Sequence, residues 1–187
     1  MIDTKQKILS KAGYLFYFQG FNNTGIDQIT KECEITKPSL YYHFDSKITL
    51  GKAYIEERAR LLFAMLIGLK ERNQSYDGYL SEWSSTLILL ARKGEFFGCP
   101  FTTFASELNE KERSEFEETL QSVESRWLSI QEKTYLHYHP TAIDSKLVAK
   151  RILILHTGCV MLYRASRNIK YLKQFKAELK TLASELS

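Results

Sequence analysis

Side chains that can donate hydrogen bonds gather in one short stretch of the chain, from Thr24 to Lys47. Its second half carries amines, hydroxyls and an imidazole, which can donate to phosphate oxygens or to the edges of bases. Leu40 and Phe44 lie four residues apart and give this half one buried face, as on a short helix. The outer and flanking faces are then left to Lys37, Pro38, Ser39, Tyr41, Tyr42 and His43, with Lys47 just beyond.

Two short helices and a turn are expected to position these donors. Apolar residues recur at three and four residue steps from Ile26 to Cys33, which predicts the first of the two helices. Glu34 then begins a turn. Thr36 is a candidate N-cap for the second helix, and Pro38 stands in its first turn, where the missing N–H costs nothing.

A longer helix precedes this pair. It is expected from Asp3 to Gln19, with one apolar face and with Gly20 as a candidate C-cap. Three helices in this order, the last two joined by a tight turn, form a known DNA-binding unit. At the start of the middle helix, Thr24 and Gly25 would offer free backbone N–H groups to a phosphate.

The order of residues in this stretch is more specific than its modest charge. The chain reads Thr-Gly-Ile-Asp-x-Ile and then Ile-Thr-Lys-Pro-Ser-Leu-Tyr-Tyr-His-Phe-x-Ser-Lys-x-x-Leu. This run closely resembles the signature of the tetracycline-repressor (TetR) family of bacterial regulators. The resemblance implies an all-helical homodimer with a small DNA-binding domain, a larger ligand-binding domain, and repression that a small molecule relieves.

Carried over position by position, the resemblance also implies which residues touch DNA. They are Lys37, Ser39, Tyr41, Tyr42, His43 and Lys47, with Pro38 at a site that a small residue usually holds. Glu34 departs from the pattern, because the family commonly has glycine in this turn. If the backbone there is left-handed, a non-glycine residue strains it by roughly 1 kcal/mol.

Composition and cysteine usage set wider limits. The chain has 187 residues, of which 44 % are hydrophobic and 13 % aromatic, and its formal net charge is only +4. These values indicate a globular protein and permit a polyanionic partner without demanding one. The N-terminus lacks the apolar run of a signal peptide, and no apolar stretch could span a bilayer. We therefore expect a cytoplasmic protein with no membrane partner.

The remaining sequence predicts a helical body, since no segment alternates like a strand. The expected fold is all-α with about nine helices. Residues 1–47 would form the helix-turn-helix DNA-binding domain, and residues 48–187 the ligand-binding and dimerisation domain. Expected helices of the body run from Ser46 to the polar residues near Glu71, and over Tyr76–Lys93, Phe101–Leu108, Lys111–His137, Ala142–Ser166 and Asn168–Leu186.

The last two of these helices are the most apolar and are expected to pair two copies of the chain. One recognition helix reads too few bases for useful specificity, so two must be held by a symmetric interface, as in a four-helix bundle. The expected partner DNA is then a palindromic, double-stranded operator. Candidate interface residues are Leu155, Cys159, Leu162, Leu172, Phe175 and Leu179.

Large aromatic residues of the body could line a pocket for an effector. Such residues suit an apolar or aromatic compound, although most aromatic residues in a helical body serve only as core. The effector itself is not identified by the sequence. The candidates are Phe63, Trp83, Phe97, Phe101, Phe104, Trp127 and Tyr163.

Two other kinds of function are alternatives to a regulator. A reactive Cys99 could mark an enzyme, but no Ser/His/Asp, Cys/His or paired-carboxylate set can be assembled around it. A dimeric small-molecule-binding protein without an operator is the other alternative. The cysteines are odd in number and widely spaced, and His137 and His139 make only half a metal site. We expect no catalytic residue, metal or cofactor.

Overall fold

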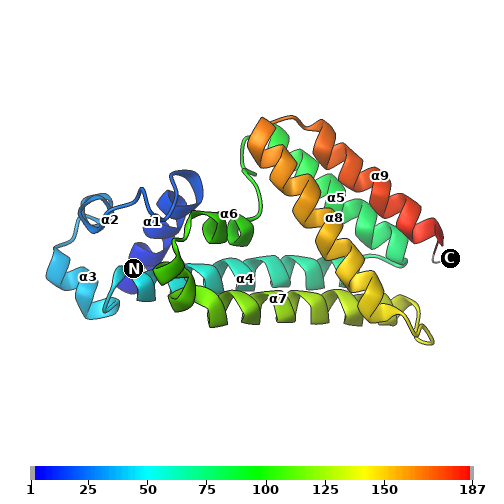
Figure 1. Ribbon diagram of the computed structural model, residues 1–187, viewed down its shortest axis with the longest axis horizontal. Helices are drawn as coiled ribbons and strands as arrows, with labels where there is room; N and C mark the ends of the chain where they lie inside the picture. The colour runs from blue at the N-terminus through cyan, green and yellow to red at the C-terminus, as the bar shows by residue number, and fades with distance from the viewer. Residues whose placement is uncertain (1–2, 186–187) are drawn as a thin grey trace. The chain divides into compact units, whose positions relative to one another are not determined.

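The computed structural model describes residues 3–185, and its regular structure within that range consists of nine helices without a strand (Figure 1). The predicted all-α fold is confirmed. No helix in the described range is both long and apolar enough to cross a membrane. Leu186, expected to end the last helix, lies outside the described residues. The helices are α1 Thr4–Phe18, α2 Ile26–Cys33, α3 Lys37–His43, α4 Lys47–Arg72, α5 Tyr76–Arg92, α6 Pro100–Glu107, α7 Glu110–Tyr138, α8 Ser145–Ser166 and α9 Lys170–Glu185.

Contacts divide the chain into two compact units. The first contains the described residues up to Arg60 together with Pro100–Val123, and the second contains Leu61–Cys99 and the described residues from Glu124 onward. Both α4 and α7 therefore begin in the first unit and end in the second. A separate domain over residues 1–47 stays a prediction, because the first unit extends well beyond Lys47.

An aromatic core explains why the first unit takes in later parts of the chain. The ring of Phe21 lies 5.1 Å from that of Phe16, 4.8 Å from Phe104 and 5.4 Å from Phe116, between ring centroids. A Cβ added to Gly51 of α4 would come within 2.9 Å of the rings of Phe21 and Phe116. Rings from α6 and α7 thus complete the core behind α1, and α4 needs a glycine to pass them.

The second unit has its own core. Here α5 and α8 both pack against α9, and the three helices can be followed side by side in Figure 1. Trp83, Tyr79 and Phe175 are among its largest fully buried side chains. Three pairs also join α5 to the end of α7, namely Tyr76 with Tyr135, Tyr79 with Gln131, and Trp83 with Trp127.

Candidate functional site

The turn between α2 and α3 is built around a left-handed residue. Glu34 has φ 54° and ψ 45°, and its N–H donates to the carbonyl of Lys31 at 3.1 Å. The next N–H, of Ile35, donates to the carbonyl of Thr30 at 3.0 Å. These two bonds form a Schellman motif with Glu34 at the position that glycine usually occupies. The turn therefore keeps the geometry that suits glycine, although the side chain is glutamate.

The start and the buried face of α3 are as the sequence predicts. The side-chain oxygen of Thr36 accepts a bond from the Ser39 N–H at 3.4 Å, so Thr36 caps the helix, and Pro38 lies in its first turn. Leu40 is fully buried and Phe44 nearly so, which anchors the inner face of α3. These contacts hold the helix so that its other face meets solvent.

The outer face of α3 presents aromatic hydroxyls and a lysine. Tyr42 is 85 % exposed and Tyr41 is 44 % exposed, which is unusual for such large rings. The amine of Lys37 lies 2.6 Å from a carboxylate oxygen of Asp27 in the first turn of α2. The hydrogen bond to Asp27 raises the pKa of Lys37, so this amine stays charged. The sequence did not reveal Asp27 as a partner, because the two residues meet only once α2 and α3 are folded.

Two residues that were expected to contact DNA, Thr24 and Lys47, instead contact other residues of the first unit. The Thr24 side chain is fully buried, its hydroxyl donates to the Gly20 carbonyl at 2.7 Å, and its N–H donates to the Phe21 carbonyl at 3.2 Å. Thr24 thus offers neither group to a phosphate, contrary to the expectation. The amine of Lys47 lies 4.3 Å from the centroid of the Phe21 ring, and burial lowers its pKa. Gly25 remains exposed at the start of α2.

A carboxylate at the end of α6 holds the loop before α2. An oxygen of Glu107 accepts a bond from the Phe21 N–H at 2.8 Å, and the Glu107 carbonyl accepts one from the Asn22 side chain at 2.6 Å. Glu112 of α7 also accepts from Asn22, at 3.3 Å. Loop, α6 and α7 are therefore joined by hydrogen bonds within the first unit. Spacing along the sequence gives no signal for contacts between residues so far apart.

The outer face of α8 carries exposed apolar side chains. Leu147, Ile154 and Leu162 are 59, 71 and 50 % exposed, and they recur with Arg151 and Gly158 at three and four residue steps. Such a stripe marks a surface that another helix can cover. Leu147 and Ile154 are not among the residues expected at the interface, although this spacing along a helix could have identified them.

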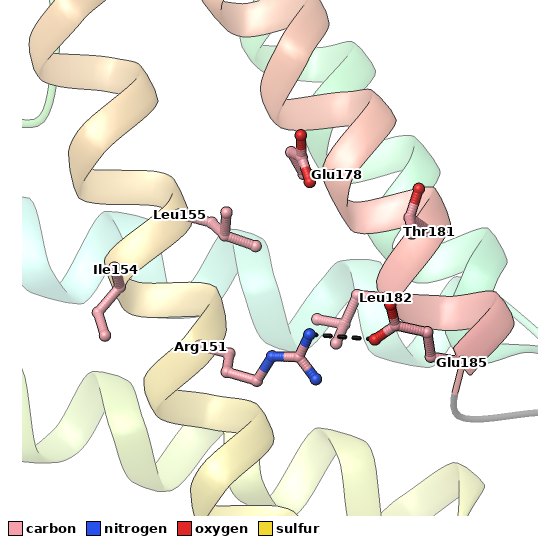
Figure 2. A pocket seen from close by; sticks show the side chains of 7 residues that line it. All are labelled: Arg151, Ile154, Leu155, Glu178, Thr181, Leu182 and Glu185. Carbon is pink, nitrogen blue, oxygen red and sulfur yellow. Dashed lines mark hydrogen bonds and ion pairs between the residues drawn. The ribbon is translucent and has the colours of Figure 1, made fainter.

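A groove of about 230 Å³ runs between α8 and α9 beside this stripe. Figure 2 shows Arg151 of α8 reaching toward Glu185 of α9, and their nitrogen–oxygen distance is 3.0 Å. Both helices contribute apolar and charged side chains to the groove. Its lining consists of Arg151, Ile154, Leu155, Glu178, Thr181, Leu182 and Glu185.

The expected interface residues divide into two groups. Leu172, Phe175 and Leu179 have at most 1 % of their surface exposed, since they point into the protomer. That burial leaves them no surface to offer a second chain, which corrects the expectation for these three. Leu155 and Cys159 are half-buried against the core of the second unit, and Leu162 is exposed.

The seven expected pocket residues do not form one cluster. Phe101 and Phe104 belong to the first unit, and Phe104 is part of its aromatic core. The other five belong to the second unit, where only Trp83 and Trp127 meet at the centre of the core, with ring centroids 6.1 Å apart. The other three are Phe63, whose ring lies beneath the Arg126 guanidinium, and Phe97 and Tyr163 near the end of α8.

The thiols are mostly enclosed. Cys33 and Cys99 are buried, and Cys159 is half-buried. Burial raises the pKa of Cys33 and of Cys159, which keeps both in the unreactive thiol form. The structure therefore adds no observation in favour of an enzyme built on Cys99.

The fold and the α2–α3 surface together define a helix-turn-helix protein. The profile described as "Bacterial regulatory proteins, tetR family" matches residues 8–54, the part of the chain that contains α1, α2 and α3. Over residues 8–54 the chain matches this TetR family, and it is a transcriptional regulator.

Two curated relatives carry names of the same kind. An uncharacterized HTH-type transcriptional regulator in the lacX 3′ region of Lactococcus lactis subsp. lactis is 26 % identical over 96 % of this chain and 92 % of its own length. The biofilm operon icaADBC negative transcriptional regulator IcaR of Staphylococcus aureus is 39 % identical over 75 residues, which cover 40 % of this chain and 38 % of IcaR.

Solved structures share the fold at lower identity. The TetR-family regulator SCO4454 of Streptomyces coelicolor is 20 % identical, with a TM-score of 0.82 over 97 % of this chain and 95 % of that one. The reduced form of NemR from E. coli is also 20 % identical, with a TM-score of 0.80 over 96 % of both chains. At this identity the likeness concerns the fold alone.

Proposed function

We propose that this chain represses transcription as a homodimer bound to a palindromic operator in double-stranded DNA, and that an apolar or aromatic small molecule releases it. The observation that carries the proposal is the outer face of α3, where Lys37 and two exposed tyrosines follow a tight turn. Repression is supported by the name of IcaR, a negative regulator similar to this chain over 75 residues. Such a repressor acts in the cytoplasm, where bacterial DNA lies.

The residues of α3 divide by the part of DNA that they suit. Lys37 is the first residue of α3, and its amine is paired with Asp27. When this ion pair breaks, the amine can instead bind a guanine edge or a phosphate of the DNA. The hydroxyls of Ser39, Tyr41 and Tyr42 suit phosphate oxygens, and His43 can donate to one as well. Pro38 provides close apolar contact and fixes the start of the helix.

The start of α2 provides a second contact with the DNA backbone. Gly25 is exposed there and leaves the first N–H groups of α2 open to a phosphate. Lys47 and Thr24 act indirectly, because their bonds to the aromatic core and to the loop before α2 keep that helix in place.

The α8 stripe is the surface on which two chains pair. A second copy related by a two-fold axis would cover Ile154, Leu162 and Leu147, which removes apolar surface from water. Gly158 has no atom within 4 Å of an added Cβ, so the backbone of a partner helix can approach there. Leu155 and Cys159 flank the stripe, and the groove between α8 and α9 receives side chains of the second copy.

Release follows from the spacing that DNA requires. Two recognition helices in successive major grooves must lie about one helical turn apart, roughly 34 Å. A ligand that binds more tightly to a conformation with another spacing lowers DNA affinity by its differential binding free energy. The continuous helices α4 and α7, which begin in the first unit and end in the second, provide the covalent connection for this change.

The test is a gel shift on a duplex selected from a random pool by repeated binding to the unaltered protein. Lys37→Ala and Tyr42→Ala should each weaken binding by about 1–3 kcal/mol, or roughly 5- to 150-fold, while light scattering still reports a dimer. Lys133→Ala is the matched control, because it removes one positive charge from an exposed site on α7 in the second unit.

The salt dependence of DNA affinity is a second test of the proposed contacts. The logarithm of affinity should fall steeply with the logarithm of salt concentration, and Lys37→Ala should reduce that slope by about one counterion if its amine contacts a phosphate. Unchanged DNA affinity in both α3 variants would rule out this face as the DNA-contacting surface. A flat salt dependence would point to a partner other than DNA.

A further inference from the structure

Three buried polar side chains of the second unit have a group without a hydrogen-bond partner among the described residues. They are the hydroxyl of Tyr76 and two groups that can only donate, Nε1 of Trp83 and Nε2 of Gln131. The side chains of Trp83 and Gln131 have 0 % exposed surface. Since buried polar groups in proteins are nearly always bonded, two unmet donors in one core indicate a missing acceptor.

The two donors belong to two helices that pack together, Trp83 to α5 and Gln131 to α7. Tyr79 and Trp83 are one turn apart on α5, and Trp127 and Gln131 are one turn apart on α7. The Tyr79 hydroxyl donates to the amide oxygen of Gln131 at 3.1 Å, and the rings of Trp83 and Trp127 are 6.1 Å apart. The amide oxygen of Gln131 therefore has a hydrogen-bond partner, whereas its NH₂ group has none. The indole N–H of Trp83 can only donate, so both groups need an acceptor.

Flat rings surround the indole of Trp83. The His156 ring is stacked on it with a centroid distance of 5.5 Å and an interplanar angle of 20°. The edge of the Phe175 ring meets it at 5.4 Å. A ligand that reaches the unmet donors is therefore held between aromatic faces, which favours a planar aromatic compound.

The charge of the ligand follows from what this core lacks. Lys, Arg, Asp and Glu are absent from the buried polar residues of the described chain, so no cation there could pair with an anion. Burial lowers the pKa of His156 to about 4, and its ring is neutral at pH 7. An anionic ligand would lie unpaired in an apolar site at high cost, whereas a neutral one would not.

We propose that the effector is a neutral aromatic molecule with a carbonyl or similar acceptor oxygen, bound by Trp83 Nε1 and Gln131 Nε2 against the His156 ring. Its regulatory meaning rests on the proposed function, but its binding chemistry does not. Because both donors are fully enclosed, the ligand binds only a conformation in which neighbouring side chains have moved apart. Ligand binding then stabilises that conformation, which is what release from DNA requires.

Acetophenone is a suitable probe, since it is neutral, aromatic and carries one carbonyl. Isopropylbenzene has the same shape without the acceptor, and benzoate adds a charge. The chain has only two tryptophans, so the indole N–H signals in a ¹⁵N–¹H spectrum are assigned with a Trp83→Phe variant. Acetophenone should move the Trp83 indole signal and the Gln131 NH₂ signals downfield and saturably, with the two control compounds binding about tenfold more weakly or less.

A double variant tests the Gln131 donor while removing both ends of its bond with Tyr79. Tyr79→Phe with Gln131→Leu removes both ends of their mutual bond, so the fold should persist, as thermal unfolding would show. Acetophenone should bind this variant about tenfold more weakly, with DNA binding retained. Equal affinity for acetophenone and isopropylbenzene, or unchanged affinity in the double variant, would overturn the proposal.

Two further outcomes separate this inference from the proposed function. Cross-relaxation between water and the two N–H groups would reveal a water molecule bonded to both donors. If that water stays bound at saturating acetophenone, the proposed ligand contact is also overturned. If the protein binds no DNA in the gel shift but acetophenone titrates as expected, the ligand site stands and the repressor function fails. If DNA is bound and acetophenone is not, the reverse holds.

Discussion

Replacing Glu34 tests the turn on which the recognition helix depends. A residue with a side chain pays about 1 kcal/mol or more for the left-handed backbone seen here, whereas glycine does not. Glu34→Gly should therefore be more stable than Glu34→Ala by about 1 kcal/mol. Both variants lose the exposed contact between Glu34 and Lys7, at 3.5 Å, so that loss cancels in the comparison.

An ordinary helical position should show the opposite order. Glu118 is exposed within α7, and there glycine should be less stable than alanine by about 1 kcal/mol. The sign of the glycine–alanine difference should thus reverse between position 34 and position 118. Glu118 and Glu34 carry the same side chain and belong to the same compact unit.

Thermal unfolding followed by far-ultraviolet circular dichroism measures both differences. For a chain of 187 residues, 1 kcal/mol corresponds to a shift in Tm of about 2–4 °C. Protein concentration must be held constant, because association of chains raises the apparent Tm. Alanine as stable as glycine at position 34 would refute the left-handed turn and, with it, the placement of α3 that depends on it.

Three further predictions address pH, dimerisation and the loop before α2. Because the pKa of folded His156 is about 4 and that of an unfolded histidine is 6.5, the unfolded chain binds more protons between these values. Stability should therefore fall by roughly 3 kcal/mol as pH drops from 6.5 to 4, and His156→Asn should lack this part of the loss in unfolding titrations. Ile154→Glu should place charges in the α8 interface and give monomers in sedimentation, whereas Lys133→Glu, at an exposed site on α7, should not. Glu107→Ala should leave the Phe21 N–H without its acceptor and cost about 1–3 kcal/mol, whereas Glu107→Gln keeps an acceptor oxygen; equal stability of the two would contradict the role of this bond.

Local features were predictable because each depends on residues close together in the chain. The apolar steps from Ile26 to Cys33, the Thr36 cap and the anchors Leu40 and Phe44 specify two short helices, and the structure has them. The left-handed backbone at Glu34 was raised only as a condition, from the glycine that the family commonly has there, and the structure shows that the condition holds. Resemblance in this stretch also identified the family, since its ordered motif lies within the matched residues 8–54.

Burial of particular side chains could not be predicted in the same way. Leu172, Phe175 and Leu179 repeat on α9 like interface residues, but a helical stripe does not say which neighbour covers it. In the structure they point into the protomer, whereas Ile154 and Leu147 of α8 are exposed. Likewise, Thr24 is of a type that binds phosphate, yet Gly20 occupies its hydroxyl.

The sequence by itself determined that the chain is helical, that α2 and α3 form a DNA-reading motif, and that Lys37, Tyr41 and Tyr42 lie on its outer side. These results follow from periodicity, capping and an ordered motif, all of which act over a few residues. Only the tertiary structure decided that Asp27 holds Lys37, that Glu107 holds the loop before α2, and that Trp83 and Gln131 each have a buried donor without an acceptor. Such contacts depend on how helices pack, because packing joins residues whose separation along the chain carries no information about their distance in space.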